Sequence, residues 1–443
     1  MRPVTKLSIR CRGEILGLVL ASALFATVAA APHPAIGADV DARFVEALNK
    51  RGWDDTAVAY LDWAAQQPTV SRDFLSLTPY FRATALVAQS RQSVSRSQRD
   101  AALQRAAEDL AAFAAARPQA EQAIDALRQL AYLRFDQAQA IGADAEKSRS
   151  PTANALAATA ARQAYEACGD AARELVDACS RRLADLPKAA AAAVGSEASE
   201  LRATLTARLA EGRFLVGLAQ FESARFETPK SRPATAAIAS ALKTFRELAE
   251  EYRSSTVGFS SQYYQGRCHQ LGGDFDKALG AYEAVVGLPT QNPEWRRWQA
   301  RAHQYRTECL VAVGKYDTAI LDAADWLQRA QAGERTRPEW QGVAYELSRA
   351  RLAKAEELGD KDNEAKRLKT EARSGLTEII RAAGPMQRPA RMLMASLGDR
   401  APKRQEVRTF AEALAAGREA VEQMNSSNLA AKLAGQNNPE VFG

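Results

Sequence analysis

The stretch QLGGDFDKALGAYEAVVGLP, from Gln270 to Pro289, decides the fold predicted for this chain. A glycine pair precedes a series of small and apolar residues spaced by steps of five, four, three and four. The series runs through Gly273, Ala278, Tyr282, Val285 and Pro289. Steps of three and four place side chains on one face of a helix, and a glycine suits the end of the preceding helix. The stretch therefore predicts the second helix of a helical hairpin.

The same spacing occurs at two other places. One copy runs through Gly52, Ala57, Leu61, Ala64 and Pro68, and another through Gly314, Ala319, Ala323, Trp326 and Ala330. The segments FSSQYYQGRCHQLG and RWQARAHQYRTECLVAVG, which precede Gly273 and Gly314, are predicted to be the first helices of their hairpins. Recurrence of one supersecondary unit is the signature of a repeat architecture.

This pattern resembles the tetratricopeptide repeat, in which a small residue of the first helix is followed by an alanine, an aromatic residue four positions later and a proline. The matching residues are Gly266, Ala278, Tyr282 and Pro289. His269 stands where an aromatic residue is usual, and Gly273 and Gly314 are 41 residues apart, whereas the usual period is about 34. The resemblance implies an all-α solenoid of antiparallel helical hairpins, of the kind found in exported bacterial envelope proteins.

A long helical hairpin is expected in the middle of this solenoid. Pro151 to Leu186 is predicted to be one helix, and LRATLTARLAEGRFLVGLAQFE to return as a second. The seam of the first helix alternates steps of three and four, as in a coiled coil. Its residues are Tyr165, Cys168, Ala172, Leu175, Cys179, Leu183 and Leu186. A homodimer formed through this hairpin is one interpretation of such a seam.

The chain begins like a secretory signal peptide. Four basic residues precede the apolar run from Ile15 to Phe25, and cleavage is expected after Ala38, with an uncleaved anchor as the alternative. This pattern predicts export to the periplasm or cell envelope of a bacterium. Removal of residues 1–38 takes away four basic residues and one acidic residue, so the formal charge falls from +6 to +3. Nearly balanced charge argues against nucleic acid as a partner.

Five segments follow from these patterns. They are a signal peptide at 1–38, N-terminal repeats at 39–135, the long hairpin at 151–225, further repeats at 236–383, and C-terminal helices with a flexible tail at 384–443. Helices are expected from Trp340 to Leu358 and from Asn363 to Ala383. The buried face of the second is predicted to contain Ala365, Leu368, Ala372, Leu376 and Ile379.

Residues typical of cofactor or metal sites are scarce. The glycine pair lacks the spacing of a phosphate-binding loop, and Asp274 is interpreted as a helix cap. Of three histidines, His33 precedes the cleavage site, and His269 and His303 come without HExxH or CxxC motifs, so we expect no metal and no cofactor. The four cysteines after residue 38 are expected to be free, mostly buried thiols.

Two alternatives to a scaffold remain. Glu222–Ser223 and the segment GPMQRPA at Gly384 resemble elements of lytic transglycosylases, which act on peptidoglycan, but more than 150 residues separate them here. Glu222 is interpreted instead as a solvated helix residue. The basic stretch from Arg381 to Arg408 could contact anionic lipid or wall polymer, although a solvated face is the commoner outcome.

The predicted function is a non-enzymatic scaffold that binds a protein or peptide partner in the concave groove of the solenoid. The resemblance implies that first helices line this groove. The predicted groove residues, taken as free of hairpin packing, are Ser260, Tyr263, Arg267, Gln270, Arg301, Gln304 and Glu308. Their mixture of aromatic, polar and charged types suits an extended peptide. A C-terminal carboxylate is disfavoured as the ligand, because the Lys and Asn pattern that some members of the family use is absent.

Overall fold

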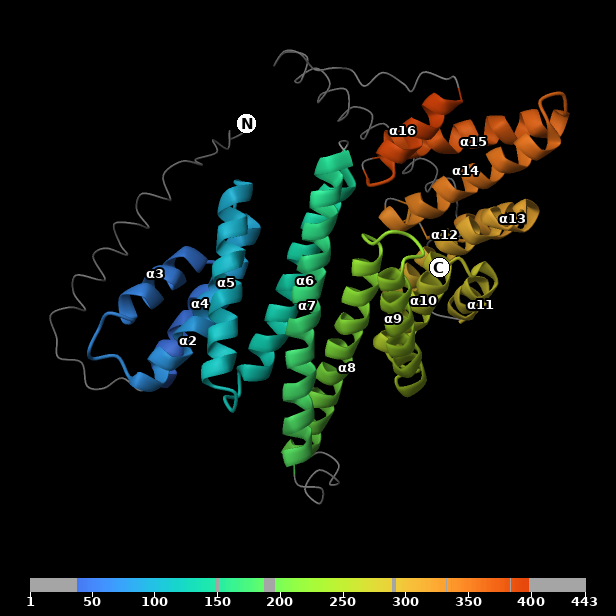
Figure 1. Ribbon diagram of the computed structural model, residues 1–443. Helices are drawn as coiled ribbons and strands as arrows, with labels where there is room; N and C mark the ends of the chain where they lie inside the picture. Colours follow the sequence, from blue (N-terminus) through green and yellow to red (C-terminus); the bar gives the residue numbers. More distant parts are fainter. Residues whose placement is uncertain are drawn as a thin grey trace, which may run out of the picture. The chain divides into compact units, whose positions relative to one another are not determined.

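The computed structural model describes residues 38–147, 151–186, 196–288, 292–331, 333–335, 337–382 and 384–397. Within these ranges all regular secondary structure is helical, as Figure 1 shows, which confirms the predicted all-α class. None of the described helices has the length and apolarity needed to cross a membrane. The proposed signal peptide, apart from Ala38, and the tail from residue 398 lie outside the described residues.

The chain divides into two compact units, Met1–Leu288 and Pro289–Gly443. Helices of the first unit are α2 (Ala38–Lys50), α3 (Asp54–Ala64), α4 (Arg72–Gln92), α5 (Arg96–Ala116), α6 (Ala123–Lys147), α7 (Pro151–Asp185), α8 (Glu197–Ala224), α9 (Arg232–Glu251), α10 (Thr256–Gly272) and α11 (Phe275–Val286). Those of the second are α12 (Pro293–Ala312), α13 (Tyr316–Gln328), α14 (Pro338–Leu358), α15 (Asn363–Arg381) and α16 (Gln387–Ser396). The boundary divides the segment 236–383, which the sequence predicts to be one block of repeats.

Helices of the first unit pack mainly on their neighbours in sequence. The most extensive contacts join α6 to α7 and α7 to α8, and α8 packs in turn on α9. The long α7–α8 pair therefore continues directly into the helices before and after it. Consecutive packing of this kind is consistent with a helical repeat array.

Three glycines form the predicted corners between helices. Gly52, Gly273 and Gly314 have φ angles of 72°, 84° and 76°, a left-handed conformation that residues with a Cβ atom rarely adopt. The small and apolar residues that follow within each helix are buried, which confirms the predicted faces. These residues are Ala57, Leu61 and Ala64 on α3, Ala278, Tyr282 and Val285 on α11, and Ala319, Ala323 and Trp326 on α13. Asp274 caps α11 as expected, because its side chain accepts a hydrogen bond from the Lys277 amide.

The seam predicted for the long helix is buried over most of its length. Its buried members are Tyr165, Cys168, Ala172, Leu175 and Cys179. Gly212 on α8 lies close to this seam, since a methyl group built there would come within 3.0 Å of the Val176 side chain. Helices approach closely where one of them carries a glycine, so the contact helps to fix the pairing of α7 with α8.

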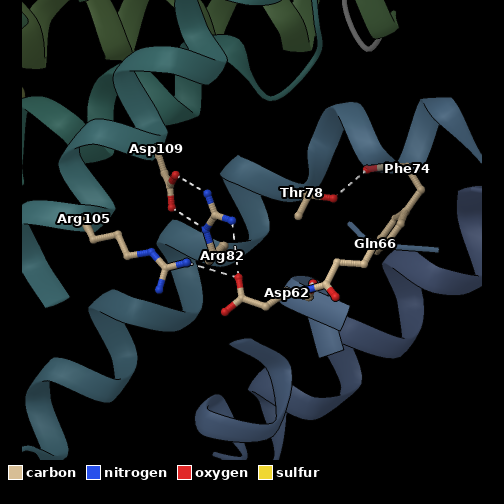
Figure 2. A network of polar contacts seen from close by, with 7 residues as sticks. All are labelled: Asp62, Gln66, Phe74, Thr78, Arg82, Arg105 and Asp109. Carbon is tan, nitrogen blue, oxygen red and sulfur yellow. Dashed lines mark hydrogen bonds and ion pairs between the residues drawn. The ribbon is translucent and has the colours of Figure 1, made fainter. Parts of the chain in front are cut away.

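An ionic network ties α3, α4 and α5 together in the first unit, as Figure 2 shows. Arg82 on α4 donates two hydrogen bonds to Asp109 on α5, at 2.7 and 2.5 Å. Asp62 on α3 accepts from Arg82 at 3.4 Å and from Arg105 at 3.1 Å. Because the Asp109 side chain is only 12% exposed, its two-point pair with Arg82 is less screened by solvent than a surface ion pair.

The second unit is organised around α14, which packs against α12, α13 and α15. One core cluster includes Trp326 on α13, Trp340 on α14 and Leu376 on α15. The face predicted for the last long helix is confirmed, because all five of its residues are buried. They are Ala365, Leu368, Ala372, Leu376 and Ile379.

Candidate functional site

The seven residues predicted to line a groove are divided between the two units. Ser260, Tyr263, Arg267 and Gln270 lie on α10 of the first unit, and Arg301, Gln304 and Glu308 lie on α12 of the second.

Two of the α10 residues are buried. The Ser260 hydroxyl donates to the Thr256 carbonyl of its own helix at 2.8 Å, and the Ser260 residue is 3% exposed. Tyr263 is 4% exposed, and its ring centroid lies 6.1 Å from that of Tyr282 on α11. The expectation that these two side chains are free of packing is wrong, because Ser260 bonds back to its own helix and Tyr263 packs within the hairpin.

The other two α10 residues are half-buried and have partners in the first unit. The Arg267 guanidinium lies 5.7 Å from the centroid of the Phe221 ring on α8. The Gln270 side-chain oxygen accepts a hydrogen bond from the Tyr282 hydroxyl at 2.8 Å. Arg267 and Gln270 thus take part in the packing of α10 on its neighbours.

The three α12 residues belong to a polar surface shared with α14, on which α12 packs directly. We call this surface the α12–α14 face. It consists of Arg297, Arg301, Gln304 and Glu308 on α12 together with Glu339, Tyr345, Glu346 and Arg349 on α14. All eight residues are described, and all lie in the second unit.

One end of the α12–α14 face has an excess of positive charge. Arg297 and Arg301 both approach the same oxygen, Oε1 of Glu339, at 3.2 and 3.3 Å. Burial raises the pKa of the Glu339 carboxyl, but its backbone hydrogen bond and the two guanidinium groups outweigh burial and lower the pKa below its usual value. The arginine side chains are 52% and 38% exposed, whereas that of Glu339 is 7% exposed. Two accessible cations therefore share one buried anion.

The other end has an excess of carboxylate groups. Glu346 is 5% exposed, and its Oε2 accepts a hydrogen bond from Arg349 at 2.8 Å. Burial raises the Glu346 pKa to about 7; the Arg349 charge opposes this shift, and the Glu308 carboxylate on α12 adds to it. Two carboxyl groups therefore lie near one guanidinium at this end, and only Glu346 forms an ion pair with it.

Between the two ends, Gln304 lies over Gly342. A methyl group built on this glycine would come within 2.2 Å of the Gln304 side-chain oxygen. Arg301 and Glu339 are 38 residues apart in sequence, and the same separation holds for Gln304 and Gly342. The two helices thus meet in a constant register along the face.

A small pocket lies beside the positive end of the face. Its lining residues are Arg296, Arg297, Ala300, Trp326, Glu334, Arg337, Glu339 and Trp340. Two of these residues, Arg296 and Glu334, form a two-point ion pair, at 2.6 and 2.7 Å. This pair also anchors the connection between α13 and α14 to α12.

The α14 residues of the face were not found by sequence reasoning. The repeat spacing of the opening stretch does not include the positions of Glu339, Glu346 or Arg349. Charge could have indicated this contact, because Arg301 and Glu339 carry opposite charges and lie about one repeat apart in the sequence. The separation of 38 residues differs from the predicted period of 41 residues, so the pairing could not be read from the repeat alone.

Glu222, the residue of the enzymatic alternative, is buried in the first unit rather than solvated as expected. It is 9% exposed, and its carboxylate pairs with Arg225 at 2.5 Å. Arg225 also pairs with Glu146 on α6 at 2.6 Å. The Glu222 carboxylate is therefore part of an ionic contact between helices, while the GPMQRPA segment belongs to the second unit.

The histidines and cysteines in the described part of the chain are packed residues. His303 is buried, and burial lowers its pKa to about 3, so its imidazole is neutral near pH 7. His269 is half-buried. Cys168, Cys179, Cys268 and Cys309 are all free and buried, as expected. Across the described ranges, no three or more His, Cys, Asp or Glu side chains are grouped so as to hold a metal ion.

Comparison with known proteins gives no relative on which to base a function. No protein-family model matches the chain, and no curated protein matches its sequence. The candidate site therefore rests on the geometry and charge of the α12–α14 face.

Proposed function

We propose that this protein is a non-enzymatic interaction scaffold that binds an extended segment of a protein partner on the α12–α14 face. The observation that carries the proposal is the incomplete charge pairing of this face. Arg297 and Arg301 share one oxygen of Glu339, while Arg349 pairs with Glu346 and Glu308 forms no ion pair with a described residue. A partner that carries groups of opposite charge would pair with the arginines at one end and with the carboxyl groups at the other. Complementary charge of this kind gives an interface its specificity.

The sequence patterns supply the context of this proposal. Helical hairpins with left-handed glycine corners support a tetratricopeptide-like solenoid, into which the long α7–α8 hairpin is inserted. Such repeats bind partners over extended surfaces. The basic and apolar start of the chain supports export, and we place the protein in the periplasm or envelope of a bacterium.

Site-specific photocrosslinking tests the proposal. A photoreactive phenylalanine analogue replaces Tyr345, a half-buried aromatic residue of the face, so that Gln304 keeps its packing over Gly342. The purified full chain is then irradiated with an envelope fraction. The matched control carries the analogue at Leu321, which is 70% exposed on α13 of the same unit. We expect a discrete crosslinked product only from position 345, and excess unmodified protein should suppress it. Equal products from both positions would contradict the assignment of the face.

The non-enzymatic part of the proposal has its own test. Purified protein is incubated with isolated peptidoglycan, and released fragments are measured by chromatography beside a Glu222→Gln variant. Because the Glu222 carboxylate is committed to Arg225, we expect no release from either protein. Release by the wild type that is lost in the variant would establish the enzymatic alternative instead.

A further inference from the structure

The two signs of charge lie at opposite ends of the α12–α14 face. Arg301 belongs to the positive end and Glu308 to the negative end, and both lie on α12. A helix rises 1.5 Å per residue, so these two positions are separated by about 10 Å along the helix axis. An extended peptide advances roughly 3.3 Å per residue, so the same distance corresponds to about three residues of a bound strand.

We propose that the segment bound on the α12–α14 face is an extended peptide that carries an acidic and a basic side chain about three residues apart. The acidic side chain lies against Arg297 and Arg301, and the basic side chain lies against Glu308, which is near the buried Glu346. The inference rests on the proposed function and specifies the chemistry of the partner.

The positive end is available to an acidic side chain. Among the described residues, Oε1 of Glu339 is the one carboxylate oxygen with which the two arginines form ion pairs, and their side chains remain 52% and 38% exposed. The Arg301 guanidinium also lies 4.8 Å from the centroid of the Trp298 ring, which restricts its orientation. A restrained guanidinium loses less conformational entropy when it binds a carboxylate.

The negative end is available to a basic side chain. Glu308 is half-buried and forms no ion pair with any residue that the structure describes, while Glu346 accepts a bond from Arg349. Burial and the neighbouring Glu308 charge disfavour ionisation of Glu346. A cationic side chain beside Glu308 would offset the repulsion between the two carboxyl groups.

The separation of charges also selects against simpler partners. A wholly acidic peptide would meet Glu308 at one end, and a wholly basic peptide would meet Arg297 and Arg301 at the other. Like charges brought together across an interface weaken binding and suppress wrong partners. A peptide with both signs satisfies the two ends together.

Binding of the basic side chain is linked to protonation of Glu346. The charged and titratable groups that act on Glu346 are Arg349 on its own helix and Glu308 on α12, and Glu346 in turn raises the pKa of Tyr345. A bound cation favours the ionised carboxylate, so binding near neutral pH releases a proton. The requirement for a basic residue is therefore stronger at about pH 8 than at about pH 6.

Peptide selection on the full chain tests the inference. A phage-displayed library of random peptides is enriched on the immobilised protein at about pH 8, where Glu346 is mostly ionised. We expect the enriched peptides to share an acidic and a basic residue separated by two to four positions, in either order, since each interacting pair spans about three residues. A synthetic peptide from this set is then titrated by calorimetry.

Two single substitutions separate the ends of the face. Arg301→Gln should select peptides that retain the basic residue but lose the acidic one, and Glu308→Gln should do the reverse. Each should weaken binding of the synthetic peptide by about two- to fivefold, the effect expected for loss of one partly exposed ion pair. Arg297 still pairs with Glu339 in the first variant, and circular dichroism confirms that both variants are folded.

The matched controls are Arg381→Gln and Glu356→Gln, which change exposed residues elsewhere in the second unit. We expect wild-type selection and affinity from both. Enriched peptides that lack the acid–base pair but still lose affinity in the face variants would overturn this inference and leave the proposed function standing. Equal effects of the face and control variants, or failure to enrich any peptide, would instead count against the proposed function itself.

Discussion

The ring of Tyr282 on α11 lies directly against Gly266 on α10. A methyl group built on this glycine would come within 2.5 Å of the ring, and Tyr282 itself is fully buried. The sequence pattern predicts a small residue at position 266 and an aromatic residue at position 282. Their contact gives the physical reason, because the ring fills the space that a side chain at position 266 would occupy.

Replacing Gly266 with alanine should destabilise the protein. The aromatic ring cannot move aside without disturbing the α10–α11 hairpin, so we expect the free energy of unfolding to fall by about 1–3 kcal/mol. Urea unfolding followed by circular dichroism measures the change. Gly280→Ala on α11 is the matched control: nothing lies within 4 Å of the added methyl group, and the helix should gain about 0.5–1 kcal/mol. Equal stability of the two variants would contradict this account.

Loss of Arg82 should open the junction of α3, α4 and α5. Arg82→Ala leaves the mostly buried carboxylate of Asp109 without its two-point partner, and we expect a loss of about 1–3 kcal/mol after allowance for solvent screening. Arg105→Ala removes a contact to Asp62 that is more exposed, because the Arg105 side chain is 48% exposed. This change should lower the free energy of unfolding by less than about 1 kcal/mol. Thermal and urea unfolding of both variants measures the two losses of stability. A larger loss for Arg105→Ala than for Arg82→Ala would contradict this prediction.

The stability of the second unit should depend on the ionisation of Glu346. Its pKa is raised from 4.5 to about 7 in the folded chain, so between these values the folded state holds a proton that the unfolded state releases. The free energy of unfolding should therefore decrease as pH rises from about 4.5 through about 7. Glu346→Gln should show a smaller decrease and be more stable than the wild type at about pH 8.

Urea unfolding at a series of pH values measures this dependence. The matched control is Glu356→Gln, because Glu356 is exposed on the same helix. The control should follow the wild type across the range. If Glu346→Gln also follows it, burial of the Glu346 carboxyl does not govern the pH dependence.

The buried cysteines should resist alkylation while the protein is folded. Burial raises the pKa of Cys168 and Cys268 to about 12 and that of Cys179 to about 11. Since the thiolate is the reacting species, iodoacetamide at about pH 8 should leave these positions unmodified. The same treatment in urea should modify them, and peptide mass spectrometry locates each adduct. Rapid labelling of any of them in the native protein would show that its site opens to solvent.

Much of the helical framework could be predicted because helix faces and corners depend on local sequence. The steps after Gly52, Gly273 and Gly314 identified buried faces, and the run from Ala365 to Ile379 identified another. Contacts between helices could not be predicted in the same way. Ser260 and Tyr263 were expected to be accessible, because the repeat period alone does not show which side of α10 is covered.

The sequence by itself determined the all-α class, the left-handed corners and the buried stripe of each hairpin, since these follow from backbone conformation and from the 3.6-residue period of a helix. Only the tertiary structure decided which charges meet. The register of α12 on α14 brings Arg301 to Glu339 and Glu308 near Glu346. That register depends on close packing, such as Gln304 over Gly342, and packing between helices far apart in sequence is not encoded in any single stretch.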